Sequence, residues 1–354
     1  MTASLSILFL LSSGLFLGWS LGANDAANIF GTAVGTKMVK FHVAAVVAAI
    51  FVIIGAVASG AGATETLGRL GSINALPGAF TVALSAALTV MSLNKLRLPV
   101  STTQAIVGGI IGWNLYAQLP TDYNALSKIV STWFLCPLLA AAVAALLYFL
   151  ARFMVNRLPL SIIRMDSYTR TGLIIVGAFG AYSLGANNIA NVMGVFVPIS
   201  PFNDADLLFL HFSSAQMLFL LGGIAIAVGI FTYSKGVMQT IGSDLFNLSP
   251  LAALIVVLSN SIVLFLFASE SLETWLTARG LPSFPLVPVS SSQAVVGAVL
   301  GIGLAKGGRN IRFDLLGKIG LGWITTPLAA GITCYIFLFL MQNIFMFEVV
   351  LSAG

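Results

Sequence analysis

Long apolar stretches separated by short polar ones run along the whole chain. Most are about 20 residues long, which is the length an α-helix needs to cross the hydrocarbon core of a bilayer. The pattern predicts an all-α polytopic membrane protein, with about 10–12 transmembrane segments if re-entrant hairpins are counted. We expect five passes in each half of the chain, near 4–30, 42–61, 76–94, 99–118, 129–151, 171–196, 208–232, 248–269, 286–305 and 318–345. The segments at 99–118 and 286–305 are either full spans or re-entrant hairpins.

Four sequence blocks occur twice, in the same order. The clearest is GANDAAN at Gly22–Asn28, which returns as GANNIAN at Gly185–Asn191. The other three pairs are 64–70 with 239–245, 99–112 with 288–301, and 128–140 with 318–330. We therefore expect two repeats, residues 1–160 and 161–354. Five passes per repeat would place the second repeat in the opposite orientation, an arrangement typical of secondary transporters with a site between the halves.

Charge supports this topology. Only 8% of residues are charged, against about 25% in soluble domains. If the N-terminus lies outside, 13 of the 16 basic residues fall in cytoplasmic loops, as the positive-inside rule requires. These are Lys37, Lys40, Lys95, Arg97, Arg152, Arg157, Arg164, Arg170, Lys235, Lys306, Arg309, Arg312 and Lys318. We expect both termini outside and a bacterial or archaeal cytoplasmic membrane. The first apolar stretch follows no basic residue and is interpreted as a retained helix rather than a signal peptide.

The GAN motifs place polar side chains inside apolar stretches. Glycine and alanine alone would be explained by close helix packing. Asn24, Asp25 and Asn28 need another explanation, because polar groups at membrane depth are costly and usually functional. Carboxylate and amide oxygens suit a hard cation such as Na⁺, whereas a carboxyl that takes up a proton is the competing interpretation. The second copy has Asn188 where the first has Asp25.

A second polar motif within the apolar sequence is a proline-valine pair followed by three hydroxyl residues. The triplets are Ser101, Thr102 and Thr103 in the first half, and Ser290, Ser291 and Ser292 in the second. Free N–H groups at a helix N-terminus, together with hydroxyl donors, can bind an anion. Ordinary N-capping is the alternative for one motif. Two opposed copies can enclose a tetrahedral anion, and a co-transported cation would then supply the missing positive charge.

These duplicated motifs resemble the inorganic phosphate transporter (PiT) family, which includes sodium- and proton-coupled phosphate carriers and a sulfate permease branch. The resemblance implies a homodimer, a transport site between the repeats and an elevator-like or rocking movement. By motif position it implies that the anion site includes Asn24, Asp25, Asn187, Asn188 and the two hydroxyl triplets. It implies cation coupling at Asp25, Asn28, Asn191 and Glu65. An ion pair with Arg69 is the structural alternative for Glu65.

One departure from the family concerns the position after each triplet, where family members often carry histidine. Here Gln104 and Gln293 stand close to the expected site, and neither can titrate near neutral pH. We expect a phosphate importer coupled to Na⁺ or H⁺, with sulfate permease as the alternative and an anion channel as a weaker one. Phosphate is favoured because it still carries a proton near neutral pH and can donate a hydrogen bond to Asp25.

Other classes of function lack support. The two histidines, His42 and His211, lie near span ends, and no catalytic triad or metal-ligand cluster is evident, so we expect no enzyme and no bound cofactor. Cys136 and Cys334 lie in apolar stretches and are expected to be core residues. The basic residues punctuate hydrophobic spans rather than forming one stripe, so nucleic acid is not an expected partner. The expected partners are the oxyanion, the coupling cation, the lipid bilayer and a second copy of the chain.

Overall fold

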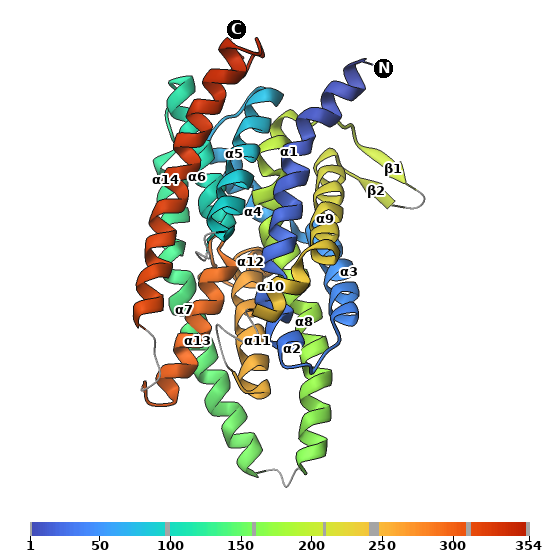
Figure 1. The fold of residues 1–354 in the computed structure, drawn as a ribbon, viewed down its shortest axis with the longest axis vertical. Helices are drawn as coiled ribbons and strands as arrows, with labels where there is room; N and C mark the ends of the chain where they lie inside the picture. The colour runs from blue at the N-terminus through green and yellow to red at the C-terminus, as the bar shows by residue number, and fades with distance from the viewer. Residues whose placement is uncertain are drawn as a thin grey trace.

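The computed structural model describes residues 2–95, 100–157, 161–207, 210–240, 248–308 and 313–351. Within these residues the protein is all-α apart from one short hairpin, as the sequence predicts (Figure 1). The first half contains α1 Thr2–Asp25, α2 Ala27–Gly35, α3 Phe41–Ser59, α4 Ala61–Leu70, α5 Leu76–Lys95, α6 Thr102–Ala117 and α7 Tyr123–Arg157. The second contains α8 Ile162–Met193, η1 Gly194–Ile199, β1 Ala205–Leu207, β2 Leu210–Phe212, α9 Ser214–Thr232, α10 Ser234–Thr240, α11 Pro250–Leu266, α12 Glu270–Thr277, α13 Ser291–Ala305 and α14 Phe313–Asn343.

Some predicted features fall on residues outside this description. They are Arg97, Pro99, Arg309, Arg312, the start of the span at 208–232 and most of the repeat block at 239–245. The remaining candidate site residues all lie within the described part of the chain.

Seven helical segments of the described chain are long and apolar enough to cross a membrane. An eighth is reached if α11 and α12, which meet at a bend of 67°, count as one broken span. The protein is therefore a multi-pass membrane protein. The helices that begin at the second hydroxyl of each triplet are shorter. Helix α6 has 16 residues and α13 has 15. At 1.5 Å per residue they extend about 24 and 22 Å, less than the ~30 Å hydrocarbon core. Each packs against the preceding apolar helix, α5 or α11. These lengths favour the re-entrant alternative over full spans for both segments.

The two halves make corresponding contacts. Helix α3 packs on α8 as α9 packs on α1, and α7 packs on α13 as α14 packs on α6. In Figure 1, α1 starts at the end that carries both termini, whereas α8 starts at the opposite end. Helices α7 and α14 also run in opposite directions in that view. This arrangement is compatible with the inverted repeat, which remains a prediction.

Glycines allow the helices of the two halves to approach closely. A Cβ added at Gly22 would lie 2.0 Å from the Ile226 carbonyl oxygen, and one at Gly185 would lie 2.1 Å from that of Val52. Gly22 and Gly185 open the two GAN motifs, so the same contact occurs once in each direction. Three further pairs match in this way, Gly55 to Tyr182 with Gly229 to Trp19, Gly108 to Pro327 with Gly297 to Pro137, and Gly112 to Gly331 with Gly301 to Ala141. Small residues at such crossings are a common basis of helix association in membranes.

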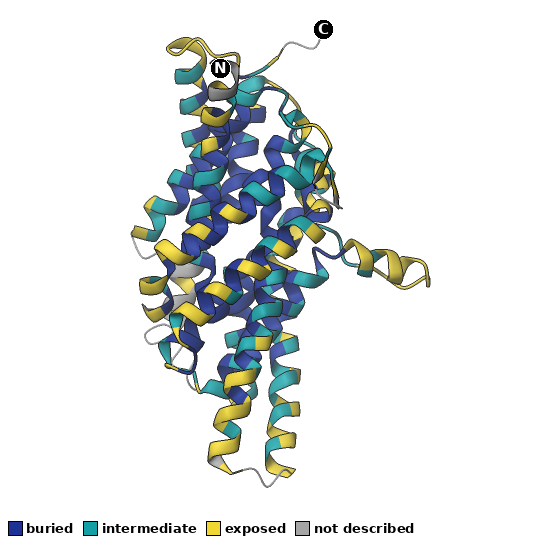
Figure 2. Ribbon diagram, turned by 90° about the vertical axis from the view of Figure 1, so that its right-hand side faces the viewer, coloured by how far each residue is buried: buried dark blue, intermediate teal, exposed yellow. Residues whose placement is uncertain are grey.

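Large apolar side chains cover the outside of the molecule. Phe134, Leu138 and Leu146 on α7 and Leu328 and Ile332 on α14 are all more than 60% exposed. Figure 2 shows exposed positions on the outer helices around a buried centre. A surface of this kind suits contact with lipid chains rather than with water.

The short hairpin lies outside the helical body. β1 and β2 pair antiparallel, with Ala205 opposite Phe212 and Asp206 opposite His211. The exposed His211 ring bonds the Asp206 carboxylate at 2.8 Å, and this hydrogen bond, with the charge of Asp206, raises the pKa of His211.

The glycine contacts predict a position-dependent response to alanine. Gly229→Ala should lower the melting temperature of the detergent-purified protein, because overpacking costs about 1–3 kcal/mol. The matched control is Gly236→Ala, where an added Cβ would meet no atom within 4 Å. Alanine usually favours a helix over glycine by about 0.5–1 kcal/mol, so this control should leave the melting temperature unchanged or slightly raised. Equal effects at both positions would contradict the packing argument.

Candidate functional site

The two GAN motifs occupy different backbone settings. Asp25 is the last residue of α1, and a single turn residue, Ala26, separates it from α2. In the second half, Asn187, Asn188 and Asn191 lie within the continuous helix α8. Both copies are buried all the same, with Asp25 3% and Asn28 9% exposed in the first and Asn188 1% and Asn191 0% exposed in the second.

The first hydroxyl of each triplet caps a helix. Ser101 accepts a hydrogen bond from the Gln104 N–H at 3.3 Å, and Ser290 accepts one from the Gln293 N–H at 3.3 Å. Each bond satisfies a backbone donor that has no partner within its own helix. The capping alternative therefore applies to Ser101 and Ser290, and leaves the second and third hydroxyls for other contacts.

One group of polar side chains, the acidic cluster, consists of Asn24, Asp25, Asn28, Ser291 and Ser292. Ser291 donates to Asp25 Oδ2 at 2.9 Å, and Asn24 Nδ2 donates to Oδ1 at 3.1 Å. Asn28 Nδ2 lies 3.1 Å from Ser291 Oγ and 3.4 Å from Ser292 Oγ. Within the described residues, no lysine or arginine pairs with this buried carboxylate. The cluster thus offers a negative charge and several oxygens to a cation.

The second group, the amide cluster, consists of Thr102, Thr103, Asn188 and Asn191. Asn191 Nδ2 donates to Thr103 Oγ1 and to Asn188 Oδ1, both at 2.9 Å. Thr103 in turn donates to the Val289 carbonyl at 3.3 Å, which brings the starts of the two triplet helices together. Thr102 Oγ1, Asn188 Nδ2 and Asn191 Oδ1 have no partner among the described residues. This cluster is uncharged and retains free hydrogen-bonding capacity for a ligand.

The two clusters are built by exchange between the halves. Asn28 from the first GAN motif bonds Ser292 from the second triplet, and Asn191 from the second GAN motif bonds Thr103 from the first triplet. These residues hold matching positions in their motifs, because both asparagines come last and both hydroxyls come third. The sequence motifs therefore assemble into one central region to which both halves contribute.

Asn187 has a different surrounding from the other predicted ligands. Its Nδ2 atom donates to the Val287 carbonyl at 3.4 Å, and its Oδ1 atom accepts from the Val289 N–H at 2.9 Å. Both ends of the amide are therefore bonded to the extended segment that leads into Ser290. Gln104 and Gln293 lie nearby in sequence and are buried, and their side-chain amide atoms have no partner within the described chain.

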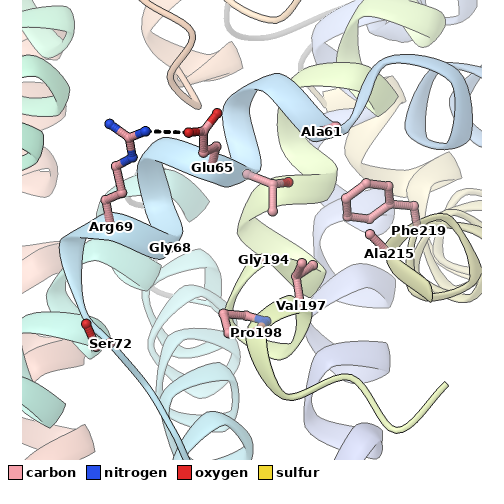
Figure 3. Close-up of a pocket in the computed structure, with 11 residues that line it drawn as sticks. Ala61, Glu65, Gly68, Arg69, Ser72, Gly194, Val197, Pro198, Ala215 and Phe219 are labelled. Atoms are coloured by element: carbon pink, nitrogen blue, oxygen red, sulfur yellow. Dashed lines mark hydrogen bonds and ion pairs between the residues drawn. The ribbon is translucent and has the colours of Figure 1, made fainter. Parts of the chain in front are cut away.

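Glu65 lies away from both clusters. It is on α4, its side chain is 69% exposed, and it forms an ion pair with Arg69 one turn later. The two residues line the edge of a mostly apolar pocket of about 460 Å³, together with η1 and α9 residues such as Pro198 and Phe219 (Figure 3). The ion pair is the structural alternative that the sequence left open, and a role for Glu65 in coupling remains a prediction.

Sequence reasoning missed two polar contacts around the second triplet. The Cys136 thiol lies 3.8 Å from the Ser290 carbonyl, and the Thr66 hydroxyl donates to the Leu286 carbonyl at 2.6 Å. Their identities alone gave no signal, since a lone cysteine or threonine in an apolar helix is usually a packing residue. The repeat gave a partial signal, because Thr66 lies in the duplicated block 64–70 and Cys136 lies in the duplicated block 128–140.

Comparison with known proteins agrees with this geometry. The model of the phosphate transporter family matches residues 21–334 and 281–352. The chain belongs to the phosphate transporter family. It is 28% identical to a protein of Methanocaldococcus jannaschii named as a candidate phosphate permease, over 95% of this chain and 98% of that one. A Thermococcus kodakarensis protein of the same description is 26% identical, over 93% and 96%.

A solved structure shares the fold of this family member. It is titled as the sodium-dependent phosphate transporter, and it matches with a TM-score of 0.76 and 21% identity over 96% of this chain and 100% of that chain. The family is one of transporters, in keeping with the expectation that this chain is not an enzyme.

The Asn187 contacts predict an effect on anion binding. Asn187→Leu removes both bonds to the segment before Ser290, so the second triplet should lose its fixed position and the anion should bind more weakly. We expect KM for phosphate uptake to rise by about tenfold, the result of losing about 1.4 kcal/mol. Ser183→Ala is the control, because Ser183 bonds only its own helix at Phe179. An unchanged KM would show that the triplet holds its position without Asn187.

Proposed function

We propose that this protein imports inorganic phosphate by symport with Na⁺, or with H⁺. The observation that carries the proposal is the exchange between halves, in which each GAN motif bonds the hydroxyl triplet of the other half. A site built in this way is accessible from either side only if the halves move relative to each other, which is the requirement for alternating access. Membership of the phosphate transporter family supports the choice of substrate.

The anion would bind where the two triplet helices start. Thr103 and Val289 are in contact there, and the unpartnered Thr102 hydroxyl and Asn188 amide are available as donors. Helix N-termini contribute further N–H groups. Fixed, uncharged donors favour an oxyanion without holding it permanently, and a nearby carboxylate would accept a hydrogen bond from the O–H group that phosphate keeps near neutral pH. Sulfate accepts hydrogen bonds only, so a carboxylate facing it would be repulsive.

The cation would bind at the acidic cluster. Asp25 is buried, and no basic residue of the described chain neutralises it. A cation at Asp25 would lower the cost of holding an anion in the adjacent amide cluster, and the anion would favour the cation in return. Such reciprocity is the physical basis of coupling between two ligands. The sodium-dependent transporter of the same fold makes Na⁺ the first candidate.

The arrangement in the membrane follows from the same proposal. The corresponding glycine contacts and the opposed directions of α7 and α14 support two inverted repeats, residues 1–160 and 161–354, that move by a rocking or elevator-like motion. We assign the protein to a cytoplasmic membrane as a homodimer, with both termini outside.

Uptake into proteoliposomes tests the proposed function. Labelled phosphate and labelled sulfate are supplied separately and in competition, under a Na⁺ gradient, a pH gradient or neither. Saturable phosphate accumulation under one gradient is the expected result. Preferential accumulation of sulfate would identify the alternative substrate, and uptake that never exceeds equilibrium under any gradient would indicate a channel.

The sidedness has its own test. The end of α7 and the start of α8 lie toward one end of the molecule in Figure 1, and the β1–β2 hairpin lies toward the other. In a background with Cys136→Ala and Cys334→Ala, Ser167→Cys should react with an impermeant thiol reagent only from the cytoplasmic side. Asn203→Cys should react only from outside. Labelling of both positions from the same side would contradict the proposed topology.

The role of Asp25 can be tested by removing its charge. Asp25→Asn should abolish gradient-driven phosphate accumulation while the protein still inserts, because Asn188 shows that an amide fits the corresponding position of the other motif. Uptake at a saturating gradient, normalised to inserted protein, is the measurement. Wild-type accumulation in this variant would exclude Asp25 as the coupling carboxylate.

A further inference from the structure

Asn260 on α11 is a buried polar side chain that belongs to neither the GAN motifs nor the hydroxyl triplets. It is 0% exposed, and neither its Nδ2 nor its Oδ1 atom has a partner among the described residues. Burying an amide without hydrogen bonds costs about 1–3 kcal/mol by protein mutational data. The rest of this helix is apolar apart from the flanking Ser259 and Ser261. A hydrogen-bonding ligand at this position would satisfy the amide.

The neighbours of Asn260 define the direction of its side chain. Ser259 donates to the Ala140 carbonyl on α7, and Ser261 lies beside Gly180 on α8, where an added Cβ would be 2.6 Å from its Oγ. Successive residues of a helix are 100° apart, so Asn260 lies between these two directions. Leu258, on the other side, is partly exposed. Asn260 therefore faces the interior, where α11 contacts α2 and α13.

Asn260 also lies at the height of the acidic cluster. The Val287 N–H donates to the Phe267 carbonyl at 3.2 Å, so these two residues lie at the same height along α11. The three extended residues from Val287 to Ser290 cover about 10 Å. The seven helical residues from Phe267 back to Asn260 also cover about 10 Å. On the α2 side, Ile29 approaches the same glycine as Ser261, with its Cγ2 atom 3.1 Å from an added Cβ at Gly180. Asn260 is thus level with the contact between Asn28 and Ser291.

The repeat shows that this feature belongs to one half only. The segment 258–262 reads LSNSI, and the corresponding part of α5, 84–88, reads LSAAL. Ala86 therefore stands where the second half has Asn260. The extra amide occurs beside the cluster that contains Asp25 and has no counterpart beside the amide cluster. An additional oxygen next to a carboxylate suits a cation, because a hard cation prefers several oxygen ligands.

We propose that Asn260 supplies its carboxamide oxygen to Na⁺ bound in the acidic cluster, together with Asp25 and Asn28. This inference rests on the proposed function in that Na⁺ is the coupling ion. It adds a ligand from α11, the helix that precedes the second triplet, so cation binding would hold α11 against α2. Because both α11 and α13 would then touch the cation site, its occupancy would fix the triplet that contacts the anion.

The test uses full-length protein and two substitutions of similar size. Asn260→Leu removes the oxygen and the unsatisfied amide, whereas Asn260→Asp keeps an oxygen. Ser261→Ala is the matched control, because the Ser261 hydroxyl bonds only Val257 within the same helix. Melting temperature is measured in detergent over a NaCl series at constant ionic strength, with choline chloride as the balancing salt. Na⁺ dependence of phosphate uptake is measured in proteoliposomes.

For Asn260→Leu we expect a melting temperature in choline chloride equal to or above that of wild type, since the unpaired amide is gone. The rise in melting temperature with Na⁺ should shrink, and the Na⁺ concentration for half-maximal uptake should increase at least about tenfold, the effect of losing one bond to a charged group. Asn260→Asp should keep a Na⁺-dependent rise, and Ser261→Ala should match wild type. An unchanged Na⁺ response in Asn260→Leu would overturn the inference.

The outcomes for the two proposals are separable. If wild type shows Na⁺-dependent stabilisation but transports no phosphate, the proposed function fails and the thermal measurement still decides the role of Asn260. If wild type transports phosphate with protons and its melting temperature does not respond to Na⁺, the function stands and the Na⁺ ligand is excluded.

Discussion

A buried carboxylate without a basic partner is the constraint on which the rest of this structure depends. Asp25 lies among apolar helices, and an isolated charge in such surroundings is strongly unfavourable. The chain provides two neutral donors, Ser291 and Asn24, which stabilise the charge without cancelling it. Among the described residues no lysine or arginine completes the neutralisation. The proposed coupling cation would supply this missing charge.

That constraint also explains why the two halves must pack so closely. Ser291 donates to Asp25 across the boundary between the halves, so any separation of α1 and α13 would break this hydrogen bond. Glycines such as Gly22 and Gly185 bring backbones into direct contact on both sides of the site. The hydrogen bonds are short-ranged, and the glycine contacts are what keep their donors and acceptors within reach. Packing and polar satisfaction are therefore parts of one arrangement.

Much of this was predictable from sequence because apolar length and duplication are local signals. The helical class, the membrane location and the two pairs of motifs could be read directly, and the family comparison confirms the resemblance that the motifs indicated. The pairing across halves was harder, because no local pattern states that Asn191 bonds Thr103. Whether the segments that contain α6 and α13 span the membrane or re-enter was left open, since an apolar run alone does not show where its helix begins. Asn260 was missed altogether, as it belongs to no motif.

Duplication with a change at one polar position of the GAN motif gives the two clusters separate chemistry. If both GAN motifs carried aspartate, two buried carboxylates would flank one anion, and binding of the anion would be opposed from both sides. Asparagine at position 188 has a side chain of similar size to aspartate and makes this position a hydrogen-bond donor. On α11 the difference runs the other way, since Asn260 adds an oxygen where α5 has Ala86. Both departures from the repeat increase the contrast between a side that attracts a cation and a side that can donate to an anion. In the proposed symport, a scaffold of this kind would change orientation as a unit while the cation and the anion keep distinct places.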